Sequence, residues 1–127
     1  MKLKTLLFLP LAALLMAAAA KAPPVVFEPP ERKSAVSIEL GQELTIVLPT
    51  TDADHVWQIV ANDSRYLRES VKLAPRTGGP TAGASATFQT SRGGHTRLSF
   101  VYVNAKITGE DIPADIRDIA VTINRKF

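Results

Sequence analysis

The chain has 127 residues, of which 46% are hydrophobic, and a formal net charge of +3 from 15 basic and 12 acidic residues. This length allows one domain. Cysteine is absent, which excludes disulfides, a lipid anchor on cysteine and a cysteine nucleophile.

The first 22 residues have the order of charge, apolar run and small residues that is typical of a secretory signal peptide. Lysines come first, the apolar run covers residues 6–15, and alanines fill positions 17–20. That run is too short to serve as a membrane span. We therefore expect cleavage between Ala20 and Ala22 and an exported protein, either periplasmic or secreted.

The positive net charge of the chain comes from the expected leader and would be lost on export. Lys2, Lys4 and Lys21 lie in or beside the leader, so cleavage after Ala22 leaves 15 − 3 = 12 basic residues against 12 acidic ones. A mature protein with no net charge gives no support to a nucleic acid or an anionic membrane as partner.

Residues 23–33 contain four prolines with charged residues between them. Such a segment is expected to be an extended tether, because proline resists both helix and central strand. The favoured interpretation is a disordered remnant of the leader. The alternative is that Val25–Phe27 packs against the edge of the domain.

From residue 34 onward, apolar and polar residues alternate with a period of two, which indicates strands with one buried face. The apolar positions are Val36, Ile38 and Leu40; Leu44, Ile46 and Leu48; residues 56–60; Ala84, Ala86 and Phe88; Leu98, Phe100 and Tyr102; and Ile119, Val121 and Ile123. Turn residues at 41–42 and 91–94 separate several of these runs. We predict an all-β, immunoglobulin-like antiparallel β-sandwich over residues 34–127.

Helical patterns are weak. Residues 62–70 could form one or two helical turns, because Asp63 or Ser64 can cap and Tyr66 can pack inward. A short turn is also possible at residues 113–118, before the last strand.

Patterns for catalysis and metal binding are also weak. His55 and His95 could bind zinc with Asp52 or Asp54, but no ligand spacing supports such a site. Asp52, Asp54 and His55 could instead imitate an acid–base cluster. The favoured interpretation is that both carboxylates hydrogen-bond to the loop backbone and that His55 is solvated. We expect no enzyme activity, no metal and no cofactor.

Three segments should meet at one end of such a sandwich: residues 48–57, 76–84 and 103–115, called here the first, second and third loops. They are polar or rich in glycine, as binding loops often are. Trp57 is expected to be a core residue that anchors the first loop. The candidate partner-binding residues are Pro49, Thr50, Thr51, Asp52, His55, Gly78, Gly79, Thr81, Asn104 and Ala105.

Several motifs follow one another along residues 34–124. They are the run Val-Ser-Ile-Glu-Leu-Gly-Gln-Glu-Leu at 36–44, Leu48-Pro49 before a loop that ends at Trp57, the glycine-rich segment 78–83, the Phe88 strand, and Gly-Gly-His at 93–95 leading to Tyr102. In this order they resemble the chagasin family of cysteine-peptidase inhibitors. The resemblance implies an immunoglobulin-like sandwich whose three loops enter the cleft of papain-like peptidases. In that scheme the first loop lies across the catalytic cysteine of the target, and inhibition is steric.

The chain departs from this family in two loops. The family's first loop carries Asn-Pro-Thr-Thr-Gly, and here Asp52 follows Pro49-Thr50-Thr51. The family's third loop begins Arg-Pro-Trp, and here Val103-Asn104-Ala105 follow Tyr102. The expected function is a monomeric, non-catalytic binding protein that resembles inhibitors of papain-like cysteine peptidases. The alternative is a structural or protein-interaction module of the cell envelope that kept the sandwich and lost inhibition.

Overall fold

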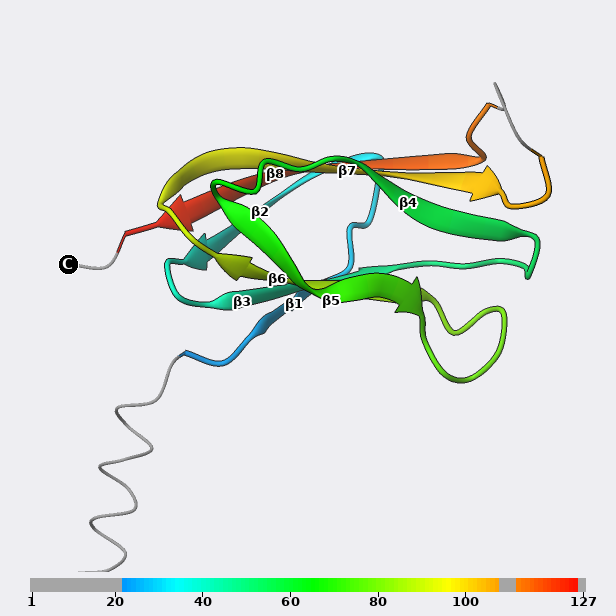
Figure 1. Ribbon diagram of the computed structural model, residues 1–127, viewed down its shortest axis with the longest axis horizontal. Coiled ribbons are helices and arrows are strands. Elements are labelled where there is room, and N and C mark those ends of the chain that lie inside the picture. Colours follow the sequence, from blue (N-terminus) through cyan, green and yellow to red (C-terminus); the bar gives the residue numbers. More distant parts are fainter. Residues whose placement is uncertain (1–21, 108–111, 126–127) are drawn as a thin grey trace, which may run out of the picture.

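Two four-stranded sheets pack face to face in the computed structural model, which describes residues 22–107 and 112–125 (Figure 1). The strands are β1 (Val25–Phe27), β2 (Lys33–Glu39), β3 (Glu43–Leu48), β4 (His55–Ala61), β5 (Leu67–Pro75), β6 (Ala84–Thr90), β7 (Gly94–Asn104) and β8 (Asp115–Asn124). One sheet has the order β1-β3-β6-β5 and the other β2-β8-β7-β4. The predicted all-β sandwich is confirmed.

The core lies between the two sheets and is made by the inward residues of the alternating strands. Phe88 on β6 and Phe100 on β7 meet edge to face across the gap, with ring centroids 6.5 Å apart. Around them lie fully buried aliphatic residues from both sheets, namely Leu44, Ile46, Leu48, Leu67, Leu98, Ile119 and Val121. Burial of these side chains supplies the main stabilisation of a domain that has no disulfide.

The predicted antiparallel pairing needs a correction at two sheet edges. β1 runs parallel to β3, with Val25 opposite Leu44, and β2 runs parallel to β8, with Lys33 opposite Asp118. Parallel neighbours need a long connection between them. The chain provides one in both cases. Between β1 and β3 it forms β2 in the opposite sheet, and between β2 and β8 it forms the five strands β3 to β7.

The N-terminal segment is not a disordered remnant. Val25 and Phe27 are partly buried against the core, and Gln42 Nε2 donates a hydrogen bond to the carbonyl of Pro23 (2.8 Å). After β1, Arg117 Nη1 donates to the carbonyl of Pro29 (2.6 Å) and holds the crossover between the sheets. The short apolar run at 25–27 is enough to join a sheet edge, so sheet structure begins before residue 34.

The expected signal peptide lies outside the described residues, apart from Ala22. Among the residues that the structure does describe, no helix is long and apolar enough to cross a membrane.

In place of the one or two helical turns predicted at residues 62–70, the structure has a single turn followed by a strand. The amides of Tyr66 and Leu67 both donate to the carbonyl of Asp63 (3.0 and 3.1 Å), and β5 begins at Leu67. The Asp63 carboxylate accepts hydrogen bonds from the Arg65 side chain and backbone, which lower the pKa of Asp63 to about 2. Likewise, the turn predicted at 113–118 is mostly strand, because β8 starts at Asp115.

Candidate functional site

The connections β3–β4, β5–β6 and β7–β8 gather at one end of the sandwich, opposite the end at which β8 finishes (Figure 1). We call this the loop end. Its irregular segments are shorter than the predicted loops, because each predicted loop includes residues that belong to strands. These are Leu48 of β3 and residues 55–57 of β4, Ala84 of β6, and residues 103–104 of β7 with Asp115 of β8. The loop end is therefore held closely by the sheets.

Backbone and side-chain hydrogen bonds join the three loops. Thr50 Oγ1 donates to the carbonyl of Pro80 and accepts from the amide of Gly83 (2.9 Å), which ties the first loop to the second. The amide of Ala105 donates to the carbonyl of Asp54 (2.8 Å), which ties the third loop to the first. The three loops thus form one continuous surface.

Two stacked aromatic rings support the first loop from below. Trp57 is only 6% exposed, and its ring stacks on Tyr102 with centroids 4.8 Å apart. The indole Nε1 donates to the carbonyl of Pro49 (2.8 Å), and the Tyr102 hydroxyl accepts from the amide of Thr51 (3.0 Å). Sequence reasoning missed this role of Tyr102. A signal was available, because an inward-facing tyrosine places a hydroxyl in the core that must find a partner.

Asp52 organises the tip of the first loop. Its Oδ1 accepts hydrogen bonds from the amides of Asp54 (2.9 Å) and His55 (3.0 Å), and it lies 3.0 Å from His55 Nδ1. The His55 side chain, followed by the two backbone amides, lowers the pKa of Asp52 below its usual value of 3.8. Asp52 therefore behaves as the sequence suggested, as a carboxylate bonded to its own loop.

The expectations for Asp54 and His55 need correction. The Asp54 carboxylate pairs with Lys106 Nζ (3.1 Å) instead of the loop backbone, because the third loop brings a lysine within reach. His55 is only partly solvated, since its side chain is 25% exposed and its ring lies 5.2 Å from that of Tyr102. Asp52, Asp54 and His55 therefore hold the tip of the first loop in place through hydrogen bonds and ion pairs.

Replacing His55 with alanine should raise the pKa of Asp52 toward 3.8, as measured by NMR titration of the carboxyl carbon. A carboxylate with a lowered folded pKa stabilises the fold above pH 3.8, and that contribution is lost as the pH falls through the folded value. Asp63 is the control, because Arg65 sets its pKa and should keep it near 2. An Asp52 pKa that does not move in H55A would contradict the assigned cause.

The second loop depends on glycine. Gly78, Gly79 and Gly83 have φ of 121°, 99° and 92°, a region that other residues rarely adopt. A Cβ on Gly83 would lie 2.9 Å from the carbonyl oxygen of Leu48, so the second loop can touch the end of β3 only without a side chain there. Thr81 is exposed on the same loop.

The third loop carries Asn104 and Ala105 at its start. Asn104 ends β7, and its Oδ1 accepts from the amide of Lys106 (2.9 Å). Beyond it, Ile107 and Ile112 are 54% and 86% exposed, and sequence reasoning did not select them. Residues 108–111 of the predicted loop lie outside the described residues.

A cavity of about 580 Å³ lies under the first and second loops, between β4 and β5. Its lining includes Trp57, Leu73, Pro75 and Pro80, with His55 and Arg76 among the polar members. Within the described residues, no group of histidines and carboxylates is arranged to hold a metal ion. The loop end therefore contains a cavity with both apolar and hydrogen-bonding groups in its lining.

The chain was compared with protein-family models, curated proteins and solved structures. No family model and no curated protein matches the chain. Among solved structures, the cysteine protease inhibitor EhICP2 from Entamoeba histolytica matches with a TM-score of 0.67 at 14% identity, covering 80% of this chain and 96% of that one. The chain has the fold of chagasin-like inhibitors.

Two further structures share this chagasin-like fold. Amebosin matches with a TM-score of 0.56 at 15% identity, covering 83% of this chain and 100% of that one. PbICP-C, solved in complex with falcipain-2, matches with a TM-score of 0.52 at 13% identity, covering 79% of this chain and 99% of that one. The likeness therefore spans nearly the whole of each of these structures.

Proposed function

We propose that the protein is an exported, non-catalytic binding protein that inhibits papain-like cysteine peptidases sterically through its loop end. The observation that carries the proposal is the linkage of the three loops into one surface at one end of a chagasin-like fold. PbICP-C has the same fold and was solved with falcipain-2, a papain-like cysteine peptidase, which supports a peptidase as the partner. Export rests on the leader sequence alone.

Steric inhibition requires a loop that keeps its shape inside the cleft. Here the backbone of the first loop is held at Pro49 by Trp57, at Thr51 by Tyr102, and at its tip by Asp52. A loop ordered before binding loses less conformational entropy when the complex forms. No group of the inhibitor has to react for the target's cysteine to be covered.

The two acids at the tip are already partnered. Asp52 stands at the position of the family's glycine, yet its carboxylate turns back onto the amides of its own loop. Asp54 is paired with Lys106. Pairing matters because an unpaired charge buried in an interface would be costly. The first loop can therefore enter a cleft with the Asp52 carboxylate already hydrogen-bonded and the Asp54 carboxylate already ion-paired.

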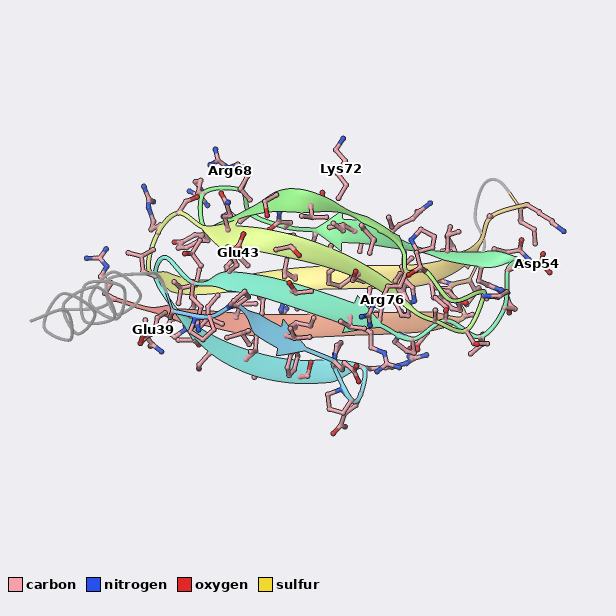
Figure 2. The ribbon with its side chains drawn as sticks, turned by 90° about the horizontal axis from the view of Figure 1, so that it is seen from below. Glu39, Glu43, Asp54, Arg68, Lys72 and Arg76 are labelled. Atoms are coloured by element: carbon pink, nitrogen blue, oxygen red, sulfur yellow. The ribbon has the colours of Figure 1, made fainter. Side chains whose placement is uncertain are left out.

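The test is an inhibition panel of papain-like peptidases, with two charge-reversal variants. Asp54→Lys lies at the loop end and Glu43→Lys lies far from it on β3, and both make the same change in charge (Figure 2). We expect D54K to weaken inhibition about tenfold or more, or ~1.4 kcal/mol, because it places two cations side by side at the tip. E43K should inhibit like the unchanged protein.

Equal effects of D54K and E43K would remove the loop end as the inhibitory surface. If the unchanged protein inhibits no member of the panel at high micromolar concentration, inhibition itself is excluded. The departures in the first and third loops would then favour the alternative, an envelope protein-interaction module. A pull-down from envelope extracts with a partner that is not a peptidase would support it.

A further inference from the structure

Each sandwich sheet has two edge strands, and three of these four edges are protected against pairing with another chain. β1 has only three residues and lies between pairs of prolines. β2 follows Pro29-Pro30 and begins with a charged residue, Lys33. Short strands, prolines and charges are the usual devices that keep a sheet edge from extending.

β5 is protected most strongly. It carries Arg68, Glu69 and Lys72, ends at Pro75, and its register with β6 shifts twice. Figure 2 shows Lys72 projecting from β5 into solvent. An added strand would have to bury or displace these charges, which is unfavourable.

The remaining edge, β4, lacks these devices along most of its length. Its sequence, His-Val-Trp-Gln-Ile-Val-Ala, contains no lysine, arginine, acid or proline. Val56 and Val60 are 36% and 56% exposed on its outer face. The only irregularity is a register shift between Ile59 and Ala61. β4 is thus an uncharged, partly apolar edge.

The pairing with β7 fixes which backbone groups of β4 are available. The amide of Ala105 donates to the carbonyl of Asp54, so Asp54 and Ala105 form a hydrogen-bonded pair. Because such pairs alternate along antiparallel strands, Val56 and Gln58 also bond to β7, and Trp57 and Ile59 direct their backbone groups to the open side. The close stacking of Trp57 on Tyr102 fits this assignment.

We propose that two copies of this chain pair reversibly through β4, antiparallel and symmetric about Gln58. In that register Trp57 of one copy faces Ile59 of the other, and each exchanges both backbone hydrogen bonds with its counterpart. Val56 of one copy faces Val60 of the other on the outer face, at positions where side chains lie close together. No like charges oppose one another.

The occupant is a second copy because the edge is complementary to itself. The two-fold axis pairs valine with valine on both sides and glutamine with glutamine at the centre, which is the pattern an isologous interface requires. Antiparallel pairing also points the two loop ends in opposite directions. Such a dimer leaves both loop ends open. The sequence had suggested a monomer.

Cross-linking tests the register directly, because the chain has no cysteine of its own. The proposed axis places the two Gln58 Cα atoms about 4.5 Å apart in a non-hydrogen-bonded pair, within the range of a disulfide. We expect Q58C to form a covalent dimer under mild oxidation. V71C, on the exposed face of the protected β5 edge, is the control and should form no disulfide-linked dimer.

Sedimentation of the cysteine-free protein tests the association. The unchanged protein should show a concentration-dependent monomer–dimer equilibrium. Val60→Lys should weaken it about tenfold or more by placing a charge on the edge, and Val71→Lys, at a residue of similar exposure, should leave it unchanged.

A protein that stays monomeric up to high micromolar concentration overturns the proposal, even if β4 accepts an extended segment of another protein. Dimerisation that V71K abolishes and V60K spares would overturn it too, because the interface would then lie on β5. Neither measurement involves a peptidase. The dimer and the inhibitory function can therefore fail independently.

Discussion

Replacing Trp57 with alanine is expected to lower the free energy of unfolding by about 3–5 kcal/mol, the usual cost of removing a large buried aromatic side chain. Trp57 is 6% exposed, stacks on Tyr102 and holds the carbonyl of Pro49. Its loss leaves a cavity beside Tyr102 and an unpartnered carbonyl. Urea denaturation followed by tyrosine fluorescence or circular dichroism measures the change.

Trp57→Phe is the matched control, because it keeps an aromatic ring against Tyr102 and removes only the indole N–H. It should cost roughly 1–2 kcal/mol, from the lost hydrogen bond and the smaller ring. If both variants are equally destabilised, the hydrogen bond to Pro49 outweighs the packing. If W57A costs less than W57F, the assigned anchor is wrong. W57A should also weaken any inhibition, because the first loop loses its support.

Replacing Arg117 with methionine is expected to cost about 2 kcal/mol, because it removes a partly buried ion pair and a hydrogen bond from a charged donor. The Arg117 side chain is 14% exposed, pairs with Asp115 (2.8 Å) and donates to the carbonyl of Pro29 (2.6 Å). Methionine preserves much of the volume but leaves both acceptors without this donor. The Asp115 carboxylate should then turn toward solvent to be hydrated, which would loosen the start of β8.

Hydrogen exchange locates the effect of R117M. The amides of β1 and of the crossover should exchange faster, because the arginine holds that crossover to the second sheet. Arg65→Met is the comparison, since it removes an arginine from an exposed pair with Asp63 and should change stability little. Unchanged exchange at β1 in R117M would show that pairing with β3 alone holds the N-terminal strand.

Strands with one strictly buried face could be predicted from the sequence. β3, β6 and β7 alternate apolar and polar residues, and their inward side chains are the ones that the pattern selected, such as Leu44, Phe88 and Phe100. β5 could not be predicted in this way. It is an edge strand with two register shifts, and after Leu67 its residues are mostly exposed, so no period of two survives.

The candidate site could be predicted at the level of segments and not of contacts. Turn residues indicated where the loops lie, and an inward tryptophan indicated an anchor. The bond from the Thr51 amide to Tyr102 joins residues 51 positions apart, and the pair of Asp54 with Lys106 depends on where the third loop turns. The sequence around each residue does not show which distant residue it contacts, because those contacts depend on how the two sheets pack.

The parallel pairing of β2 with β8 has a mechanical consequence. All seven residues of β2 face β8 in continuous register, from Lys33 opposite Asp118 to Glu39 opposite Asn124. Because the strands are parallel, a force pulling β2 at its beginning and β8 at its end slides one strand along the other. The hydrogen bonds of the pair then bear the load together instead of opening one by one. A domain stretched between its two ends would first lose the three-residue pairing of β1 with β3 and would then resist further extension through this strand pair.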